Sequence, residues 1–241
     1  MKKISIMNLI RALLFAIISF LISGTIYSQQ LTDLDIIKMK IKNDEDASKI
    51  NFEDKSSYIG TPYVNPDFQY GTVYIKDSLI SPLLALRYNV ISKQIETKES
   101  LKTRNFDIIN LKKVPDLIVK IKEQTFVLVP FEGSIQNGEF FEVLYEGTQV
   151  DILKKHAKDV RYPLKSHTSL TRDIPAKFTD NPLYFLVTKR KRFFQLPDSK
   201  NDKYQVFGQK ADFLKKYAKD KKLNIEDETD LITIVKYFEK Q

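Results

Sequence analysis

The chain has 241 residues, with 39 Lys and Arg against 31 Asp and Glu, a net charge of +8, and neither Cys nor Trp. Its hydrophobic fraction of 42% and charged fraction of 29% are typical of globular proteins and exclude wholesale disorder, collagen and a multi-span membrane protein. Without cysteine, disulfide scaffolds, cysteine zinc sites, iron–sulfur clusters, thiol nucleophiles and a lipid anchor on an N-terminal cysteine are also excluded.

Residues 1–28 have the layout of a secretory signal peptide. Two lysines and Arg11 precede an apolar run, 12–22, and small residues follow it as far as Ser28. The run is shorter than the roughly 20 residues that a membrane-spanning helix needs, so we favour a cleavable signal over an uncleaved anchor or an internal helix. Cleavage after Ser28 removes three cations and no acid, which leaves a net charge of +5. The mature protein is expected in the periplasm or outside the cell.

Residues 29–57 are polar and compatible with partial disorder, and short apolar runs separated by turn residues begin at Tyr58. Strands so closely spaced predict an antiparallel meander rather than βαβ units. One pair is expected to join across Glu146 and Gly147, with the glycine supplying the positive φ of a tight turn. A longer loop is expected over 161–175. The predicted strands are 72–75, 84–91, 94–98, 106–109, 116–121, 125–130, 139–145, 149–153, 176–179, 183–188 and 192–196.

The hydrophobic period changes near the C-terminus. Residues 209–220 and 227–239 each carry apolar side chains at helical spacing, and acidic residues crowd the start of the second segment, as the helix dipole favours. The predicted fold is therefore α+β: an antiparallel β-rich body over 58–197, followed by a C-terminal helical hairpin over 203–241 packed on the body. The body is predicted to be a meander that is either open or a partly closed barrel or roll.

Several short motifs follow one another along the chain: Gly60-Thr-Pro-Tyr-Val-Asn65 with Gly71, Leu86-Arg-Tyr-Asn89 with Glu96, 125–130, 140–147 and 230–237. In this order they resemble the motifs of a group of exported, signal-peptide-bearing β-rich proteins of Bacteroidota-type bacteria. The resemblance covers most of 58–241. It implies a signal peptide, a β-rich body and a C-terminal helical element, and it supplies no catalytic residues.

No pattern of catalytic or metal-binding residues stands out. Ser166, His167 and Asp173 are close in sequence but lack a nucleophile elbow, and we interpret them as part of a polar loop. The two histidines, at 156 and 167, lack metal-ligand spacing, and His156 is expected to face solvent after two lysines. The acidic stretches 43–46 and 198–202 lack a calcium-loop pattern and are expected to be solvated turns. No metal or cofactor is therefore expected.

Four glutamates could furnish the paired carboxylates of a glycoside hydrolase. That chemistry needs two carboxyl groups about 5–10 Å apart across a cleft, a distance that the sequence does not give. The alternative interpretation is that they are charges on strand surfaces, which we favour. The residues are Glu96, Glu139, Glu142 and Glu146.

The most specific candidate site is a run of four cations followed by two aromatic residues, which is expected at a hairpin tip. Such a tip could bind anionic groups, with Lys165, Arg172 and Lys177 adding to the basic surface if the preceding loop folds back beside it. The alternative is a solvated turn whose cations keep an edge strand from aggregating. The run consists of Lys189, Arg190, Lys191, Arg192, Phe193 and Phe194.

Arg87 and Asn89 form a second candidate because they share one face of a predicted strand. They could line a ligand pocket, or Arg87 could form a buried ion pair with Glu96 across a hairpin. We favour the structural role.

These patterns favour an exported binding or interaction protein of the cell envelope over an enzyme. An anionic envelope surface or an envelope protein is the expected partner, and nucleic acid is disfavoured because an exported protein meets little of it. The two alternative hypotheses are an envelope hydrolase with paired carboxylates and a peripheral membrane binder that uses residues 189–194.

Overall fold

The computed structural model describes residues 50, 54–104, 107–165 and 172–241, which belong to one compact unit, Lys49–Gln241. The predicted signal peptide, 1–28, and most of the polar segment, 29–57, lie outside the described residues. Within the described residues, no helix combines the length and the apolar character needed to cross a membrane.

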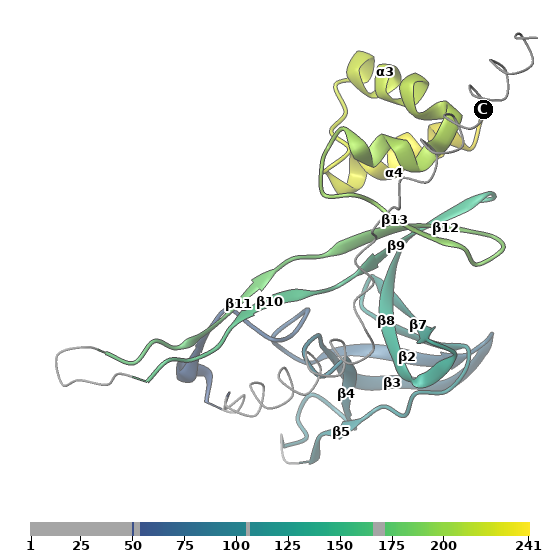
Figure 1. Ribbon diagram of the computed structural model, residues 1–241. Helices are drawn as coiled ribbons and strands as arrows, with labels where there is room; N and C mark the ends of the chain where they lie inside the picture. The colour runs from purple at the N-terminus through teal and green to yellow at the C-terminus, as the bar shows by residue number, and fades with distance from the viewer. Residues whose placement is uncertain (1–49, 51–53, 105–106, 166–171) are drawn as a thin grey trace, which may run out of the picture. The chain divides into compact units, whose positions relative to one another are not determined.

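An open sheet of ten strands forms most of the body, and every pairing in it is antiparallel, as predicted (Figure 1). Strand β13 lies at one edge and β5 at the other, so the sheet is not closed into the barrel considered from the sequence. The strands, in their order across the sheet, are β13 (Phe193–Gln195), β12 (Leu183–Thr188), β9 (Val150–Lys155), β8 (Ser134–Glu146), β7 (Gln124–Phe131), β6 (Leu117–Ile121), β2 (Gln69–Ile75), β3 (Ser78–Asn89), β4 (Gln94–Lys98) and β5 (Ile109–Asn110).

A smaller sheet has the order β1 (Tyr58–Ile59), β11 (Ala176–Asp180) and β10 (Lys158–Arg161), with β1 parallel to β11. Strand β10 follows β9 and β12 follows β11, so the two sheets share a long two-stranded ribbon. Part of the predicted loop 161–175 continues this ribbon, because Leu164 and Ile174 exchange both backbone hydrogen bonds. The sequence did not predict β10, because its four residues carry three charges and only one apolar side chain.

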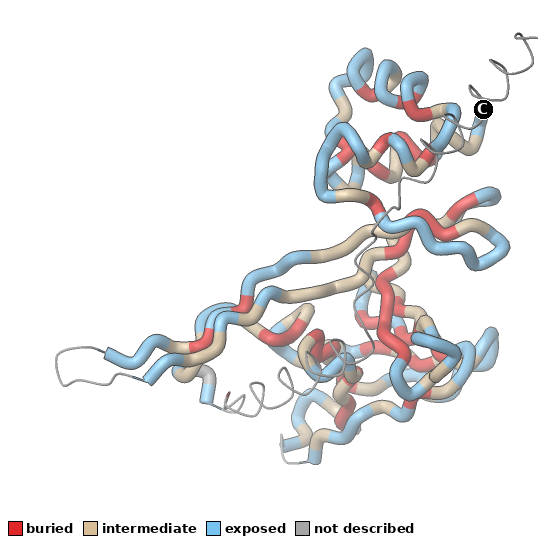
Figure 2. Tube along the Cα trace, in the orientation of Figure 1, coloured by how far each residue is buried: buried red, intermediate tan, exposed pale blue. Residues whose placement is uncertain are grey.

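Strand β8 is buried along its centre because both of its faces are covered, which Figure 2 shows as a continuous red stretch. Phe140 packs into a cluster formed with β2, β3, β4, β6 and β7. On the opposite face, Phe141 packs against Leu153 and Val187 of neighbouring strands. Burying one aromatic ring of this size contributes roughly 1.5–3 kcal/mol, so β8 stabilises two hydrophobic clusters at once.

The predicted helical hairpin is present and consists of α3 (Ala211–Lys221) and α4 (Glu228–Phe238). It is preceded by the 3-10 segment η3 (Asp202–Lys210), which is interrupted at the non-helical Gly208. Asp227 caps α4 by accepting hydrogen bonds from the N–H groups of Thr229 and Asp230. The apolar faces of the helices pack with β9 and β12 in a third cluster. Its fully buried members include Leu214, Ile225, Ile234, Val235 and Ile152.

Glu239, just after α4, connects the helical hairpin to the turn between β8 and β9. Its carboxylate accepts hydrogen bonds from the N–H of Gln149 at 2.7 Å, the N–H of Val150 at 3.1 Å and the hydroxyl of Tyr145 at 2.7 Å. Burial alone would raise the pKa of Glu239, but these donors outweigh it and lower the pKa below its ordinary value.

The same contact corrects the predicted role of Gly147. This glycine is not among the positive-φ residues, and three residues, 147–149, separate β8 from β9 instead of a two-residue turn. A Cβ at Gly147 would collide with the Glu239 carboxylate and the Val150 carbonyl. Glycine is therefore needed for close approach, because a side chain would push Glu239 away from the turn.

We expect Glu239→Gln to weaken the docking of the helical hairpin, because an amide accepts these hydrogen bonds less strongly than a carboxylate. The expected loss in the free energy of unfolding is about 1–2 kcal/mol, measured by urea denaturation with circular dichroism. Glu146→Gln, an exposed position beside the same turn, is the matched control. Equal stability of the two variants would contradict the assigned role of Glu239.

Candidate functional site

The basic–aromatic hairpin, residues 189–194, lies at the tip and on the edge strand of β12–β13, as the sequence predicted. The turn is held by three hydrogen bonds: Thr188 N–H to the Arg192 carbonyl, Lys191 N–H to the Thr188 carbonyl, and Arg192 N–H to the Thr188 hydroxyl. Lys191 has a φ of 59°, the left-handed conformation that closes a three-residue hairpin loop. The cations are therefore displayed on an ordered turn.

Three of the four cations in this hairpin are available to a partner. Lys189 donates to the Asp151 carboxylate at 2.5 Å, which neutralises its charge. Arg190, Lys191 and Arg192 are exposed, and no ion pair joins them to a carboxylate among the described residues. Arg192 lies 5.6 Å from the ring centre of Phe194, within cation–π range.

The two aromatic residues point to opposite faces of β13, as alternation along a strand requires. Phe193 packs edge-on against the rings of Phe141 and Phe185, and it remains 38% exposed. Phe194 lies opposite Leu186, which belongs to the cluster under the helices, and it is 40% exposed. Both rings thus combine a packing role with an exposed surface.

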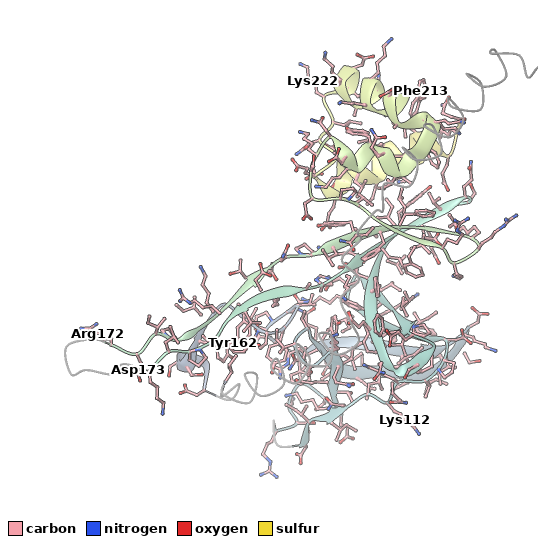
Figure 3. The ribbon with its side chains drawn as sticks, viewed as in Figure 1. Lys112, Tyr162, Arg172, Asp173, Phe213 and Lys222 are labelled. Carbon is pink, nitrogen blue, oxygen red and sulfur yellow. The ribbon has the colours of Figure 1, made fainter. Side chains whose placement is uncertain are left out.

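The basic residues of the 161–175 loop do not join this surface, which corrects that part of the sequence prediction. Lys177 lies opposite Arg161 in the β10–β11 ladder, near one end of the ribbon. The β12–β13 turn follows Thr188, at the opposite end of the ribbon. At about 3.3 Å per residue, the 12 positions from Lys177 to Lys189 span roughly 40 Å of extended chain. Arg172 is farther still, at the distal end of the ribbon in Figure 3.

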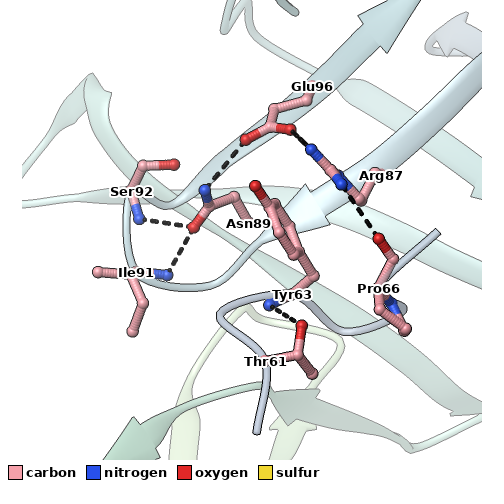
Figure 4. Close-up of polar contacts among 8 residues, drawn as sticks. All are labelled: Thr61, Tyr63, Pro66, Arg87, Asn89, Ile91, Ser92 and Glu96. Carbon is pink, nitrogen blue, oxygen red and sulfur yellow. Dashed lines mark hydrogen bonds and ion pairs between the residues drawn. The ribbon is translucent and has the colours of Figure 1, made fainter. Parts of the chain in front are cut away.

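The second candidate, Arg87, forms the ion pair with Glu96 that the sequence suggested (Figure 4). The two residues are directly opposite on β3 and β4, and their side chains are only 13% and 12% exposed. Arg87 Nε and Nη2 donate to Glu96 Oε2 at 3.1 and 2.5 Å, and Nη1 donates to the Pro66 carbonyl at 3.0 Å. The guanidinium also lies 3.6 Å from the ring centre of Tyr63 and 4.3 Å from that of Phe68.

Asn89 completes this cluster. Its amide donates to Glu96 Oε1 at 3.0 Å, and its carbonyl oxygen accepts the N–H groups of Ile91 and Ser92, each at 3.1 Å. Both Arg87 and Asn89 therefore use their polar atoms inside the chain. They fasten the 61–66 segment and the β3–β4 turn, which agrees with the structural role rather than with a ligand pocket.

Two of the candidate carboxylates are buried, which corrects their interpretation as strand-surface charges. Glu139 forms ion pairs with Lys93 and with Lys155, the latter at 2.5 Å. Glu142 is on the opposite face of β8, because it is three residues further along the strand. Glu139 and Glu142 therefore do not face each other across a cleft, and their closeness in the sequence alone does not make them a catalytic pair.

His156 is half-buried, contrary to the prediction that it faces solvent. Its side chain is 13% exposed and packs against the rings of Phe126 and Tyr88, with Nε2 2.6 Å from Glu142 Oε2. Gln124 donates to the other oxygen of Glu142 at 3.0 Å. The sequence placed His156 and Glu142 on separate elements, and a register shift in β8 between Val143 and Tyr145 hides which residues face each other.

The remaining sequence candidates add no site. Residues 43–46 and Ser166 and His167 lie outside the described residues. Asp198 and Asp202 flank the start of η3. No group of three His, Asp or Glu side chains that could hold a metal ion is found in the ranges that the structure describes.

Comparisons with known proteins give no match: no model of a protein family, no curated protein and no solved structure matches this chain. The geometry of the site is therefore the basis for assigning a function.

The Glu142–His156 contact predicts a specific dependence of stability on pH. Burial alone raises the pKa of Glu142, but hydrogen bonds from His156 and Gln124 outweigh it and lower the pKa below the ordinary 4.5. The ionised carboxylate therefore stabilises the fold above about pH 4.5, and this contribution is lost as the pH falls through the lower folded pKa.

We expect Glu142→Gln to reduce the free energy of unfolding at neutral pH by roughly 1–3 kcal/mol. The difference in free energy of unfolding between the variant and the parent protein should become smaller below about pH 4.5. Chemical denaturation across the acid range measures both effects. Glu123→Gln, in the exposed β6–β7 turn, is the control. If the difference in free energy of unfolding stays constant down to the lowest measurable pH, the role of the ionised Glu142 is contradicted.

Proposed function

We propose that the protein is an exported binding module of the cell envelope, and that it contacts an anionic partner through the basic–aromatic hairpin. The observation that carries this proposal is the display of Arg190, Lys191 and Arg192 on an ordered turn without a carboxylate partner in the described ranges. By contrast, Lys93, Lys155 and Lys189 each form an ion pair with a carboxylate. The turn therefore concentrates unpaired positive charge that could attract anionic groups.

Export is supported by the sequence of residues 1–28, where cations, a short apolar run and small residues follow one another as in a secretory signal. The resemblance of 58–241 to exported β-rich proteins of Bacteroidota-type bacteria agrees with this. The absence of cysteine is compatible with the periplasm, because the fold needs no disulfide when it buries several hydrophobic clusters.

A binding role fits the geometry better than hydrolysis does. The carboxylates of Glu96, Glu139 and Glu142 each have cationic or amide partners within the chain, and Glu139 and Glu142 lie on opposite faces of β8. Insertion of the hairpin into a bilayer would need both rings at one side of the tip, yet Phe193 and Phe194 lie on opposite faces of β13. The hairpin is better suited to a surface contact that uses charge together with the edge strand.

Fractionation of a Bacteroidota-type bacterium that expresses the full chain tests the proposal. We expect the protein in the periplasmic or secreted fraction, shortened by the signal peptide. The purified mature protein is expected to co-sediment with isolated envelopes at low ionic strength and to be released at high ionic strength. Reversal of charge at Arg190, Lys191 and Arg192 to glutamate is expected to reduce co-sedimentation at least about tenfold.

The matched control reverses Lys215, Lys216 and Lys219, which are also exposed but lie on α3. It makes the same change in net charge away from the hairpin, so binding should be retained. Retention of the full chain in the cytoplasm would contradict export. Equal loss of binding in the two variants would show that net charge, and not the hairpin, governs the interaction.

A further inference from the structure

Strand β13 presents an unused main-chain edge. In the β12–β13 ladder, Arg192 accepts from Thr188 N–H and Leu196 N–H donates to the Tyr184 carbonyl. Residues of an antiparallel strand alternate between the two sides, so the main-chain groups of Phe194 also face β12. The N–H and C=O groups of Phe193 and Gln195 therefore point away from the sheet.

This edge is open in the described structure. Strand β13 is the last strand in the order of the large sheet, all three of its residues are exposed, and no other described strand pairs with it. Exposed strand edges of this kind are templates for an added strand, which gains affinity from main-chain hydrogen bonds. Phe193 and Phe194 border the edge on opposite faces, so each ring could contact alternate side chains of an added strand.

The charge beside the edge indicates the chemistry of such a strand. Arg190, Lys191 and Arg192 precede β13 directly, and at the other end Leu196 is buried and Pro197 follows. Among the residues that the structure describes, a segment lying along β13 would thus meet the unpaired cations of this hairpin at one end. Carboxylates at that end of the segment would be complementary to them.

We propose that β13 accepts an extended segment of another protein as an added β-strand, with acidic residues of that segment bound by Arg190, Lys191 and Arg192. This inference rests on the proposed function and specifies its partner as an acidic peptide segment instead of a lipid surface. The added strand forms hydrogen bonds with the outward N–H and C=O groups of Phe193 and Gln195. The two phenylalanine rings cover its alternating side chains on either face.

Fluorescence anisotropy tests this with two labelled synthetic peptides and the mature protein. Both contain three consecutive glutamates and a run of alternating valine and threonine, with the glutamates at the N-terminal end of one peptide and the C-terminal end of the other. We expect one of the two to bind, because the cations lie at one end of the edge. Reversal of charge at Arg190, Lys191 and Arg192 is expected to weaken binding at least about tenfold.

Gln195→Pro tests the main-chain contact, because it removes an outward N–H that the β12–β13 ladder does not use. It is expected to weaken binding about three- to tenfold, as for one hydrogen bond, whereas Gln195→Thr keeps the N–H and should bind normally. A peptide with N-methylated valines tests the same main-chain contact without altering the protein. It lacks the N–H groups that would bind the edge, so it should not bind. Circular dichroism shows whether both variants remain folded.

Vesicles of equal parts phosphatidylglycerol and phosphatidylcholine distinguish failure of the strand-addition proposal from failure of the proposed function. Binding of vesicles but of neither peptide would overturn strand addition and leave an anionic lipid surface as the partner of the proposed function. Peptide binding that N-methylation and Gln195→Pro both leave unchanged would also overturn it, because only charge would then matter. If neither peptide nor vesicles bind, and the charge-reversed variant aggregates instead, the cations protect an edge and the proposed function fails as well.

Discussion

The burial of β8 on both faces is the constraint on which the rest of the structure depends. This strand carries Phe140 into the cluster formed with β2–β4, β6 and β7, and Phe141 into the cluster on the opposite face. Glu139 and Glu142 are buried in the same strand, so each needs cationic or hydrogen-bonding partners. Those partners come from the β3–β4 turn, β9 and the first residue of β7, and they set how these elements pack around β8.

This arrangement explains why the helical hairpin is joined to the sheet by polar as well as apolar contacts. Its helices bury Leu214, Ile234 and Val235 against β9 and β12, and Glu239 binds the turn that joins β8 to β9. Lys154 of β9 also pairs with Glu228 at the start of α4, at 2.5 Å. Apolar burial supplies most of the stabilisation, and these charged contacts fix the orientation of the helices on the sheet.

The sequence predicted the class of fold and most strands because apolar runs and turn residues are local signals. The amphipathic spacing of Leu231, Ile234 and Val235 likewise predicted α4. Sequence patterns did not predict the partners of Glu142 or the inward-facing position of His156, since these depend on strand register and on a bulge in β8. Several turns have a lysine in the left-handed conformation, where glycine or asparagine is usual, including Lys76, Lys93 and Lys122. The residue types at these positions therefore did not indicate a positive φ.

The candidate site was only partly visible in the sequence. The cations and rings of 189–194 were recognised, as was the ion pair of Arg87 with Glu96, because each lies within one hairpin. The free edge of β13 could not be recognised, since strand order across a sheet depends on contacts between distant segments. That order places β13 beside β12, and no strand of the described residues pairs with its outer side. The basic turn therefore lies next to main-chain groups that another strand could bind.

Amide hydrogen exchange of the free protein, followed residue by residue with NMR, tests the central claim that β13 is an open edge fixed to a rigid sheet. The Phe194 and Leu196 amides should exchange slowly, because they face β12, and the alternate amides of Phe193 and Gln195 should exchange fast. Slow exchange at all four positions would show that another segment already covers the edge. Fast exchange at all four would show that β13 is not held in the sheet, and either result would contradict the account.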